Sequence, residues 1–86
     1  MPEISRFFGI IITMYFKDHA PPHFHAHYNE HEALIAIESL GIVQGALPPK
    51  ALSLVVEWAS QHREELLANW QASSNVGSFQ KITPLA

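Results

Sequence analysis

The sequence predicts an α+β fold in which a small antiparallel β-meander of three to four strands is followed by one long C-terminal helix packed on the sheet. Two patterns predict this fold. Apolar residues recur at every second position in several segments between residues 7 and 47, as they do in strands. From residue 48 onward they recur at steps of three and four residues, which indicates an amphipathic helix. We therefore expect residues 1–86 to form a single domain.

Turn and loop residues separate the predicted strands. Tandem prolines end the first strand, because proline cannot donate to a β-ladder. The segments expected as strands are Phe7–Phe16, His23–Tyr28, Ala33–Glu38 and Ile42–Leu47. Asn29–His31 and Ser39–Gly41 supply short turns between the later ones. Strands joined by such short turns pair antiparallel, so a meander is the simplest topology.

The helix is expected to run from about residue 48 to residue 71, with two prolines in its first turn. Its apolar stripe consists of Ala51, Val55, Trp58, His62, Leu66 and Trp70. We expect this stripe to cover the face of the first strand that carries Phe8, Ile10 and Ile12. Both tryptophans should then be at least partly buried. The tail, Lys81–Ala86, is expected to add a short edge strand.

The second face of the predicted sheet is not strongly polar. The apolar residues expected on it are Phe7, Ile11, Tyr15, Leu34 and Ala36. An exposed apolar patch of this kind marks an interaction site. We therefore expect the chain to form a homo-oligomer, with a homodimer as the simplest case.

The composition excludes several classes of protein. The formal charge is −3 with neutral histidines, and the five lysines and arginines are scattered, so direct nucleic-acid binding is not expected. The absence of cysteine excludes disulfides and thiolate metal sites. The longest apolar run, Phe7–Phe16, is too short to cross a bilayer, and the N-terminus does not resemble a signal peptide. We therefore expect a cytoplasmic protein with no membrane partner.

Histidines are concentrated in and just before the second predicted strand. One face of that strand carries His23, His25 and His27, and the other carries Phe24, Ala26 and Tyr28. Neighbouring histidines on one face lie about 6.6 Å apart, so two of them can reach one metal ion but three cannot. The predicted metal ligands are His23 and His25, with His19, Asp18, His31 and Glu30 as candidates for the remaining ligands. The metal would be a divalent transition ion such as zinc, nickel or manganese.

Two other interpretations of the histidines stay open. A row of solvated or hydrogen-bonded histidines on a strand needs no metal. General acid–base catalysis needs none either, and Asp18-His19 beside Tyr28 could supply it. A separate histidine, His62, is expected to be a core residue that donates to a backbone carbonyl, on the opposite side of the sheet from the strand histidines.

An ordered set of short segments resembles a bacterial protein family. The segments are Met1–Ile4, Phe7–Phe16, Asp18-His19, Pro21–Ala26, Tyr28, Ala33–Ile37, Gly45, Leu47-Pro48, Val56–Trp58, His62, Glu65-Leu66 and Asn69-Trp70. Together they resemble the short proteins of domain-of-unknown-function family forty-one sixty, over nearly the whole chain. The family motif corresponds here to His19, His23, His25 and Tyr28, with Asp18 alongside. The resemblance implies no established activity.

The resemblance also implies a genetic context. Members of the family are similar to one half of small two-gene bacterial units that resemble toxin–antitoxin pairs, which implies a neighbour-encoded small protein as a partner. The first hypothesis is therefore a protein–protein interaction module that pairs with itself or with that neighbour. The second is a metal-dependent enzyme or metal-binding domain that uses the His-x-His strand. The third is a ribonuclease-type toxin whose candidate catalytic residues are His19, His23 and Tyr28.

Overall fold

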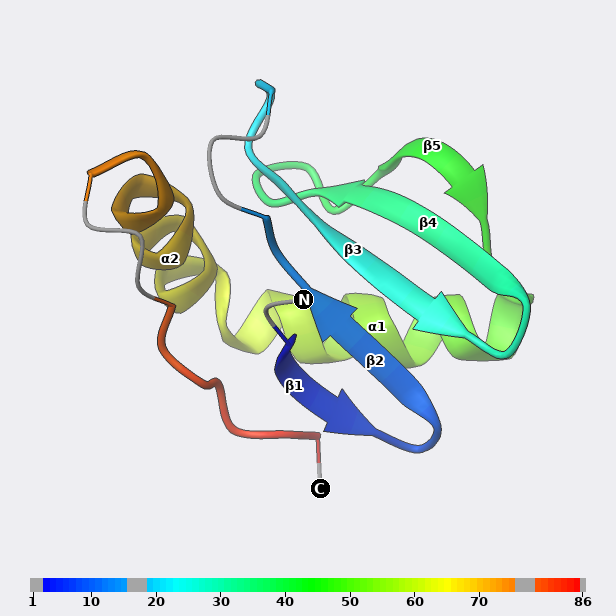
Figure 1. Cartoon of the computed structure of the whole chain (residues 1–86). Coiled ribbons are helices and arrows are strands. Elements are labelled where there is room, and N and C mark those ends of the chain that lie inside the picture. Colours follow the sequence, from blue (N-terminus) through cyan, green and yellow to red (C-terminus); the bar gives the residue numbers. More distant parts are fainter. Residues whose placement is uncertain (1–2, 16–18, 76–78, 86) are drawn as a thin grey trace.

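Within the residues that the structure describes, five strands come first along the chain and two helices follow. The structure is a computed structural model, and it describes residues 3–15, 19–75 and 79–85 (Figure 1). The strands are β1 (Glu3–Phe7), β2 (Ile10–Thr13), β3 (His23–Tyr28), β4 (His31–Ala36) and β5 (Ile42–Ala46). The helices are α1 (Pro49–Gln61) and α2 (Arg63–Asn75). The α+β class is confirmed, but the predicted three to four strands and single helix are too few.

The strands form one antiparallel sheet in the order β1-β2-β3-β4-β5, so the predicted meander is confirmed. The strand β3 lies at its centre, where Ala26 pairs with Ile12 of β2 on one side and with Ala33 of β4 on the other. The helix α1 crosses one face of the sheet (Figure 1). The sheet therefore has one face covered by α1 and one face that α1 does not cover.

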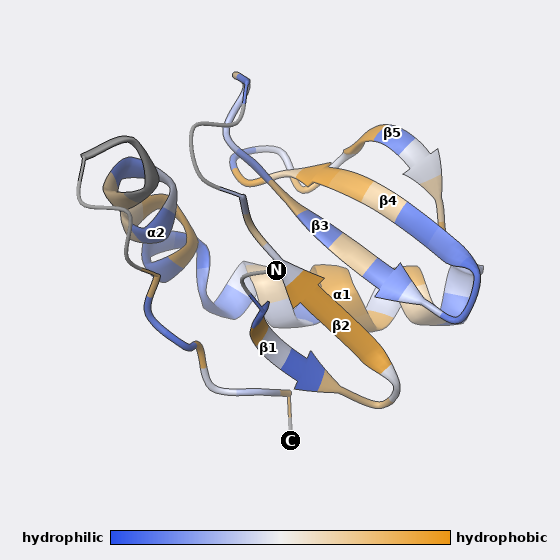
Figure 2. Ribbon diagram, viewed as in Figure 1, coloured by the Kyte–Doolittle hydropathy of each residue, from blue (hydrophilic) through white to orange (hydrophobic). Residues whose placement is uncertain are grey.

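The core lies between the sheet and α1. Trp58 is fully buried there, with its ring centroid 5.3 Å from that of Phe7 and 5.9 Å from that of Phe24. Its Nε1–H donates to the carbonyl oxygen of Thr83 at 2.9 Å, which satisfies the polar atom of the indole. Figure 2 shows that β2 is apolar over most of its length, up to Thr13 at its end, whereas β3 alternates between hydrophilic and hydrophobic residues. The other buried apolar residues are Ile4, Ile10, Ile12, Met14, Ala26, Ala33, Ile35, Ile37, Leu47, Ala51, Val55, Ala59, Leu66 and Ile82.

The predicted strand Phe7–Phe16 is wrong because a turn interrupts its apolar run. Phe8 and Gly9 have φ angles of 50° and 80°, and they join β1 to β2 as a two-residue hairpin turn. Two positive φ angles are typical of the type I′ turn, which usually contains glycine and asparagine rather than phenylalanine. The turn places Phe7 in the core and leaves Phe8 59% exposed, so neither lies on its predicted face. Phe16 lies outside the described residues.

The predicted helix of residues 48–71 is wrong in one respect, because it breaks into α1 and α2 at His62. This residue has φ −130° and ψ 26°, and its N–H donates to the carbonyl oxygen of Ala59 at 3.1 Å, which ends α1 in a tight turn. Neither glycine nor proline marks the break. Next to the break, Arg63 Nε donates to the carbonyl oxygen of Ile37 at 3.2 Å. Both tryptophans are at least partly buried, as predicted. Neither helix in the described residues is long and apolar enough to cross a membrane.

The other predicted strands differ from the observed ones only at their ends. The bounds of His23–Tyr28 are confirmed as those of β3. The predicted strand Ala33–Glu38 begins two residues too late, because the turn before β4 contains only Asn29, with φ 54°, and Glu30. The predicted strand Ile42–Leu47 is one residue longer than β5. The earlier start of β4 brings Glu32 into the sheet.

The tail is not the predicted edge strand Lys81–Ala86, whose last residue lies outside the described part of the chain. It is held by individual hydrogen bonds. The N–H of Ile82 donates to the carbonyl oxygen of Ile4 at 2.8 Å. The buried side chain of Asn69 donates to the carbonyl oxygen of Gln80 and accepts from its N–H, both at 2.9 Å. The tail therefore runs beside β1 and covers part of the outer edge of this strand (Figure 1).

Replacing Gly45 tests the approach of β5 to β4. Gly45 has φ 83°, and an added Cβ would overlap the carbonyl oxygen of Glu32. We expect Gly45→Ala to lower the free energy of unfolding by at least about 1–2 kcal/mol, the cost of the left-handed conformation alone. The matched control is Gly41→Ala, whose Cβ would meet only Ser39 Oγ at 3.4 Å. Urea denaturation measures both, and equal stabilities of the two variants would contradict the observed backbone of β5.

Candidate functional site

The strand histidines lie on the face of the sheet that α1 does not cover. Phe24 and Ala26 are fully buried on the covered face, and the alternation of β3 directs His23, His25 and His27 the other way. This is the arrangement that the period-two pattern predicts. The face is not open along its whole length, because α2 brings the Trp70 ring to within 5.1 Å of the His23 ring.

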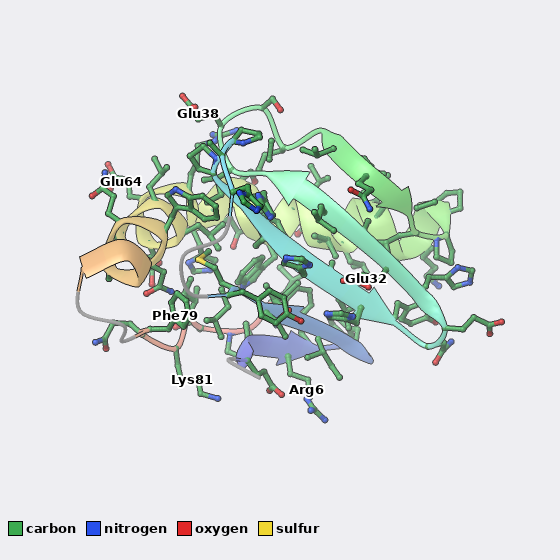
Figure 3. All side chains as sticks on the ribbon, turned by 45° about the horizontal axis from the view of Figure 1, so that its top comes forward. Arg6, Glu32, Glu38, Glu64, Phe79 and Lys81 are labelled. Carbon is green, nitrogen blue, oxygen red and sulfur yellow. The ribbon has the colours of Figure 1, made fainter. Side chains whose placement is uncertain are left out.

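A carboxylate from β4 joins this histidine face. Glu32 Oε2 lies 3.1 Å from His25 Nδ1 and 3.9 Å from His27 Nε2. The register pairs His27 directly with Glu32, so the two side chains leave the sheet on the same face. Figure 3 shows Glu32 lying over the face of the sheet that is turned toward the viewer. On the other side of β3, Thr13 Oγ1 and His27 Nε2 are hydrogen-bonded at 3.2 Å.

The hydrogen bonds of His23 and His25 determine where each ring carries its proton. His23 Nδ1 lies 2.7 Å from the carbonyl oxygen of Pro21, and His25 Nδ1 bonds to the Glu32 carboxylate. A carbonyl oxygen and an ionised carboxylate can only accept, so Nδ1 must donate in both rings. In its neutral form each imidazole therefore carries its proton on Nδ1. Two neighbouring rings thus share one tautomer.

Aromatic rings enclose this pair. The centroids of the His23 and His25 rings are 5.3 Å apart, with their planes at 57°. Tyr15 meets His25 edge to face at a centroid distance of 4.5 Å. Only 4% of His23 is exposed, so the Trp70 side of the pair is screened from water. Hydrogen bonds in such surroundings are electrostatically stronger than in bulk water.

The predicted catalytic set is not brought together in the described structure. Tyr28 lies at the opposite end of β3 from His23, about 17 Å along the strand, and on the opposite face. Its ring lines a separate 460 Å³ cavity. The other lining residues are Phe8, Ile10, Pro48, Lys50, Ala51 and Leu54. His19 is exposed and precedes β3 in the loop. Tyr28 is therefore remote from His23.

The predicted metal set is only partly described. His23 and His25 are neighbours on one face, as the metal hypothesis requires, and Asp18 lies outside the described residues. Within residues 3–15, 19–75 and 79–85, no three histidine, aspartate or glutamate side chains gather at distances that could hold a metal ion. The described residues therefore offer an imidazole pair and not a complete ligand set.

His62 bonds differently from the prediction. Its Nδ1 donates to the Glu65 carboxylate at 2.6 Å, and not to a backbone carbonyl. Its ring lies 5.6 Å from that of the buried Trp58, which places it at the margin of the core. Glu65 lies three residues after His62, in the first turn of α2, and side chains at this spacing also meet on a continuous helix.

A second exposed feature is the strand β5 at the edge of the sheet. All five of its residues are exposed, and its two large apolar side chains, Ile42 and Val43, are 41% and 48% exposed. Within the described residues, no strand pairs with the outer edge of β5. The apolar patch predicted on the second face is not exposed in this way. Phe7 lies in the core, and the other four residues, Ile11, Tyr15, Leu34 and Ala36, are partly buried.

Sequence reasoning missed Glu32 and Thr13 as members of the histidine face. Glu32 falls between the predicted turn Asn29–His31 and the predicted strand Ala33–Glu38, whereas a two-residue turn at Asn29-Glu30 places it directly opposite His27. Thr13 was one polar residue in an apolar strand, which was a usable signal. Its hydroxyl is buried and needs a hydrogen-bond partner, which His27 Nε2 provides.

The fold and the histidine face define a small α+β protein in which a central strand carries polar imidazoles on one face and core residues on the other. The sequence model of one family matches residues 9–71, and its description is Domain of unknown function (DUF4160). Because the match covers more than half of the chain, the chain belongs to this family, as the motif resemblance predicted. Neither the curated proteins nor the solved structures contain a significant match.

The shared tautomer of His23 and His25 is directly measurable. We expect long-range ¹H–¹⁵N correlation spectra of the neutral rings to show the proton on Nδ1 in both residues, because Pro21 and Glu32 offer only acceptors. Glu32→Gln should release His25 from this constraint and leave His23 unchanged. The opposite tautomer in the parent chain would contradict the observed hydrogen bonds.

Proposed function

We propose that this chain is a protein–protein interaction module that assembles through the open edge of β5, and that the strand bound there is β5 of a second copy. The observation that carries the proposal is the full exposure of β5, together with its two exposed apolar side chains. An uncovered strand offers a row of backbone donors and acceptors to another strand.

The two edges of the sheet differ. The outer edge of β1 runs beside the tail, which donates from Ile82 to Ile4. No described residue provides a comparable cover for β5. Natural proteins protect exposed edges with charged side chains, proline or covering segments, since bare edges associate. The difference between the edges therefore favours β5 as a surface that is covered by association.

The sequence of β5 favours association with itself. Ile42-Val-Gln-Gly-Ala46 contains no charged residue and no proline. Antiparallel pairing of two such strands about a two-fold axis brings no like charges together and satisfies both edges equally. That axis stands perpendicular to the sheet, so both histidine faces would lie on the same side of one continuous sheet. A neighbour-encoded strand, which the family resemblance suggests, is the competing occupant.

Mutation of β5 tests the proposal. We expect the untagged chain to elute at twice its monomer mass in light scattering, over about 10 µM to 1 mM, the range in which weak complexes form. Ile42→Lys with Val43→Lys should give the monomer, because charges on an edge prevent pairing. The matched control is Ser53→Lys with Gln61→Lys, which adds the same charges on exposed residues of α1 and should leave the dimer intact.

Two results would contradict the proposal. The first is a parent chain that stays monomeric across the whole concentration range. The second is a complex, either with itself or with the product of an adjacent gene, that survives both lysine substitutions in β5. Urea denaturation of the lysine variant is the control for folding. A cooperative unfolding transition excludes unfolding as the cause of dimer loss.

A further inference from the structure

We propose that the cavity at the beginning of α1 binds a small aromatic carboxylate, with the ligand ring against Phe8 and the carboxylate beside Lys50. This inference goes beyond the interaction module proposed above and does not depend on it. Three observations support it: an apolar cavity of 460 Å³, a cationic side chain in its lining, and an exposed aromatic residue in a strained turn at the same place.

The cavity lies where one end of the sheet meets the beginning of α1. The β1–β2 turn, the end of β3 and the first turn of α1 lie at the same end of the molecule (Figure 1). The lining includes the buried residues Ile10 and Ala51 and the half-buried residues Tyr28 and Leu54. The volume falls within the range of roughly 300–1,000 Å³ that small-molecule sites occupy. Volume and lining therefore fit a compact apolar body, such as one aromatic ring with a short chain.

The charge at this cavity is positive, although the whole chain has a formal charge of −3. Lys50 lines the cavity, and the described lining contains no aspartate or glutamate. Lys50 forms no ion pair with any residue that the structure describes. The end of α1 adds partial charge of the same sign, because Pro48 supplies no side-chain cap and the first turn contains no acidic residue. An anionic ligand therefore complements the cavity better than a cation or a neutral molecule.

Phe8 is a residue whose position the fold alone does not explain. Its φ of 50° is unfavourable for a phenylalanine, and 59% of the residue is exposed to water. Asn-Gly is the pair that such a turn favours. Phe8 nevertheless lines the cavity, and the following Gly9 lies against Tyr28, since an added Cβ would be 3.6 Å from Tyr28 Cε1. Strained residues are concentrated at ligand sites, and an aromatic ligand would cover the exposed ring of Phe8.

Titration of the ¹⁵N-labelled full-length chain with 3-phenylpropionate tests the site. We expect saturable chemical-shift changes at the amides of Gly9, Tyr28, Lys50 and Ala51. The expected Kd is on the order of 1 mM, which suits a ligand of about 11 non-hydrogen atoms. The matched ligand is 3-phenylpropanamide, which has the same shape and no charge. It should bind about 2- to 5-fold more weakly, the usual effect of one exposed ion pair.

A charge variant tests the role of Lys50. We expect Lys50→Gln to weaken binding of 3-phenylpropionate about 2- to 5-fold and to leave binding of the amide unchanged, because only the acid is attracted by the ammonium group. The matched control is Lys81→Gln, which removes the same charge from an exposed residue of the tail. It should leave the affinity for both ligands unchanged.

A turn variant separates ligand binding from folding. We expect Phe8→Asn to be at least as stable as the parent chain in urea, because asparagine is favoured at this position of the turn. Its affinity for both ligands should nevertheless fall about 3- to 10-fold, because the aromatic contact is lost. A phenylalanine with only a structural role would leave these affinities unchanged.

Four results would each overturn the proposal. The first is the absence of saturable shifts at the four amides up to about 20 mM acid, roughly twenty times the expected Kd. The second is equal affinity for the acid and the amide. The third is unchanged affinity in Phe8→Asn. The fourth is the appearance of the same shifts when only the protein concentration is raised, which would show that a second copy fills the cavity.

Discussion

The packing of Phe24 against Trp58 determines which way every residue of β3 points. Phe24 and Ala26 are buried against α1, so the pleat of the strand sends its histidines to the other face. A shift of one residue would bury three imidazoles and expose a phenylalanine, which the hydrophobic effect strongly disfavours. Because β3 is the central strand, its pairing then sets the neighbours that the histidines meet, Thr13 on β2 and Glu32 on β4.

Each polar group on the histidine face has a local partner. The bonds run from His23 to Pro21, from His25 to Glu32 and between His27 and Thr13. Such bonds offset the cost of withdrawing polar rings from water. They also fix the orientations of the rings. The uncovered edge of β5 lies on another part of the sheet.

The sequence was sufficient to predict the regular parts of this fold and insufficient where tertiary contacts override local pattern. The strand His23–Tyr28 and its phase were predictable, because alternation over six residues has one interpretation. The hairpin turn at Phe8-Gly9 was not, since an aromatic residue at a positive φ gives no turn signal. The break at His62 was hidden because the apolar spacing continues across it. Glu32 was missed for a related reason, an error of two residues in the start of β4.

Proton–proton contacts measured by nuclear Overhauser spectroscopy test the phase of β3 most directly. The structure predicts cross-peaks between the ring of Phe24 and the indole of Trp58, and between the ring of His25 and that of Tyr15. No cross-peak should join His25 to Trp58. Cross-peaks that connect Phe24 to Tyr15, or His25 to Trp58, would place the histidines on the core side and contradict the site described above.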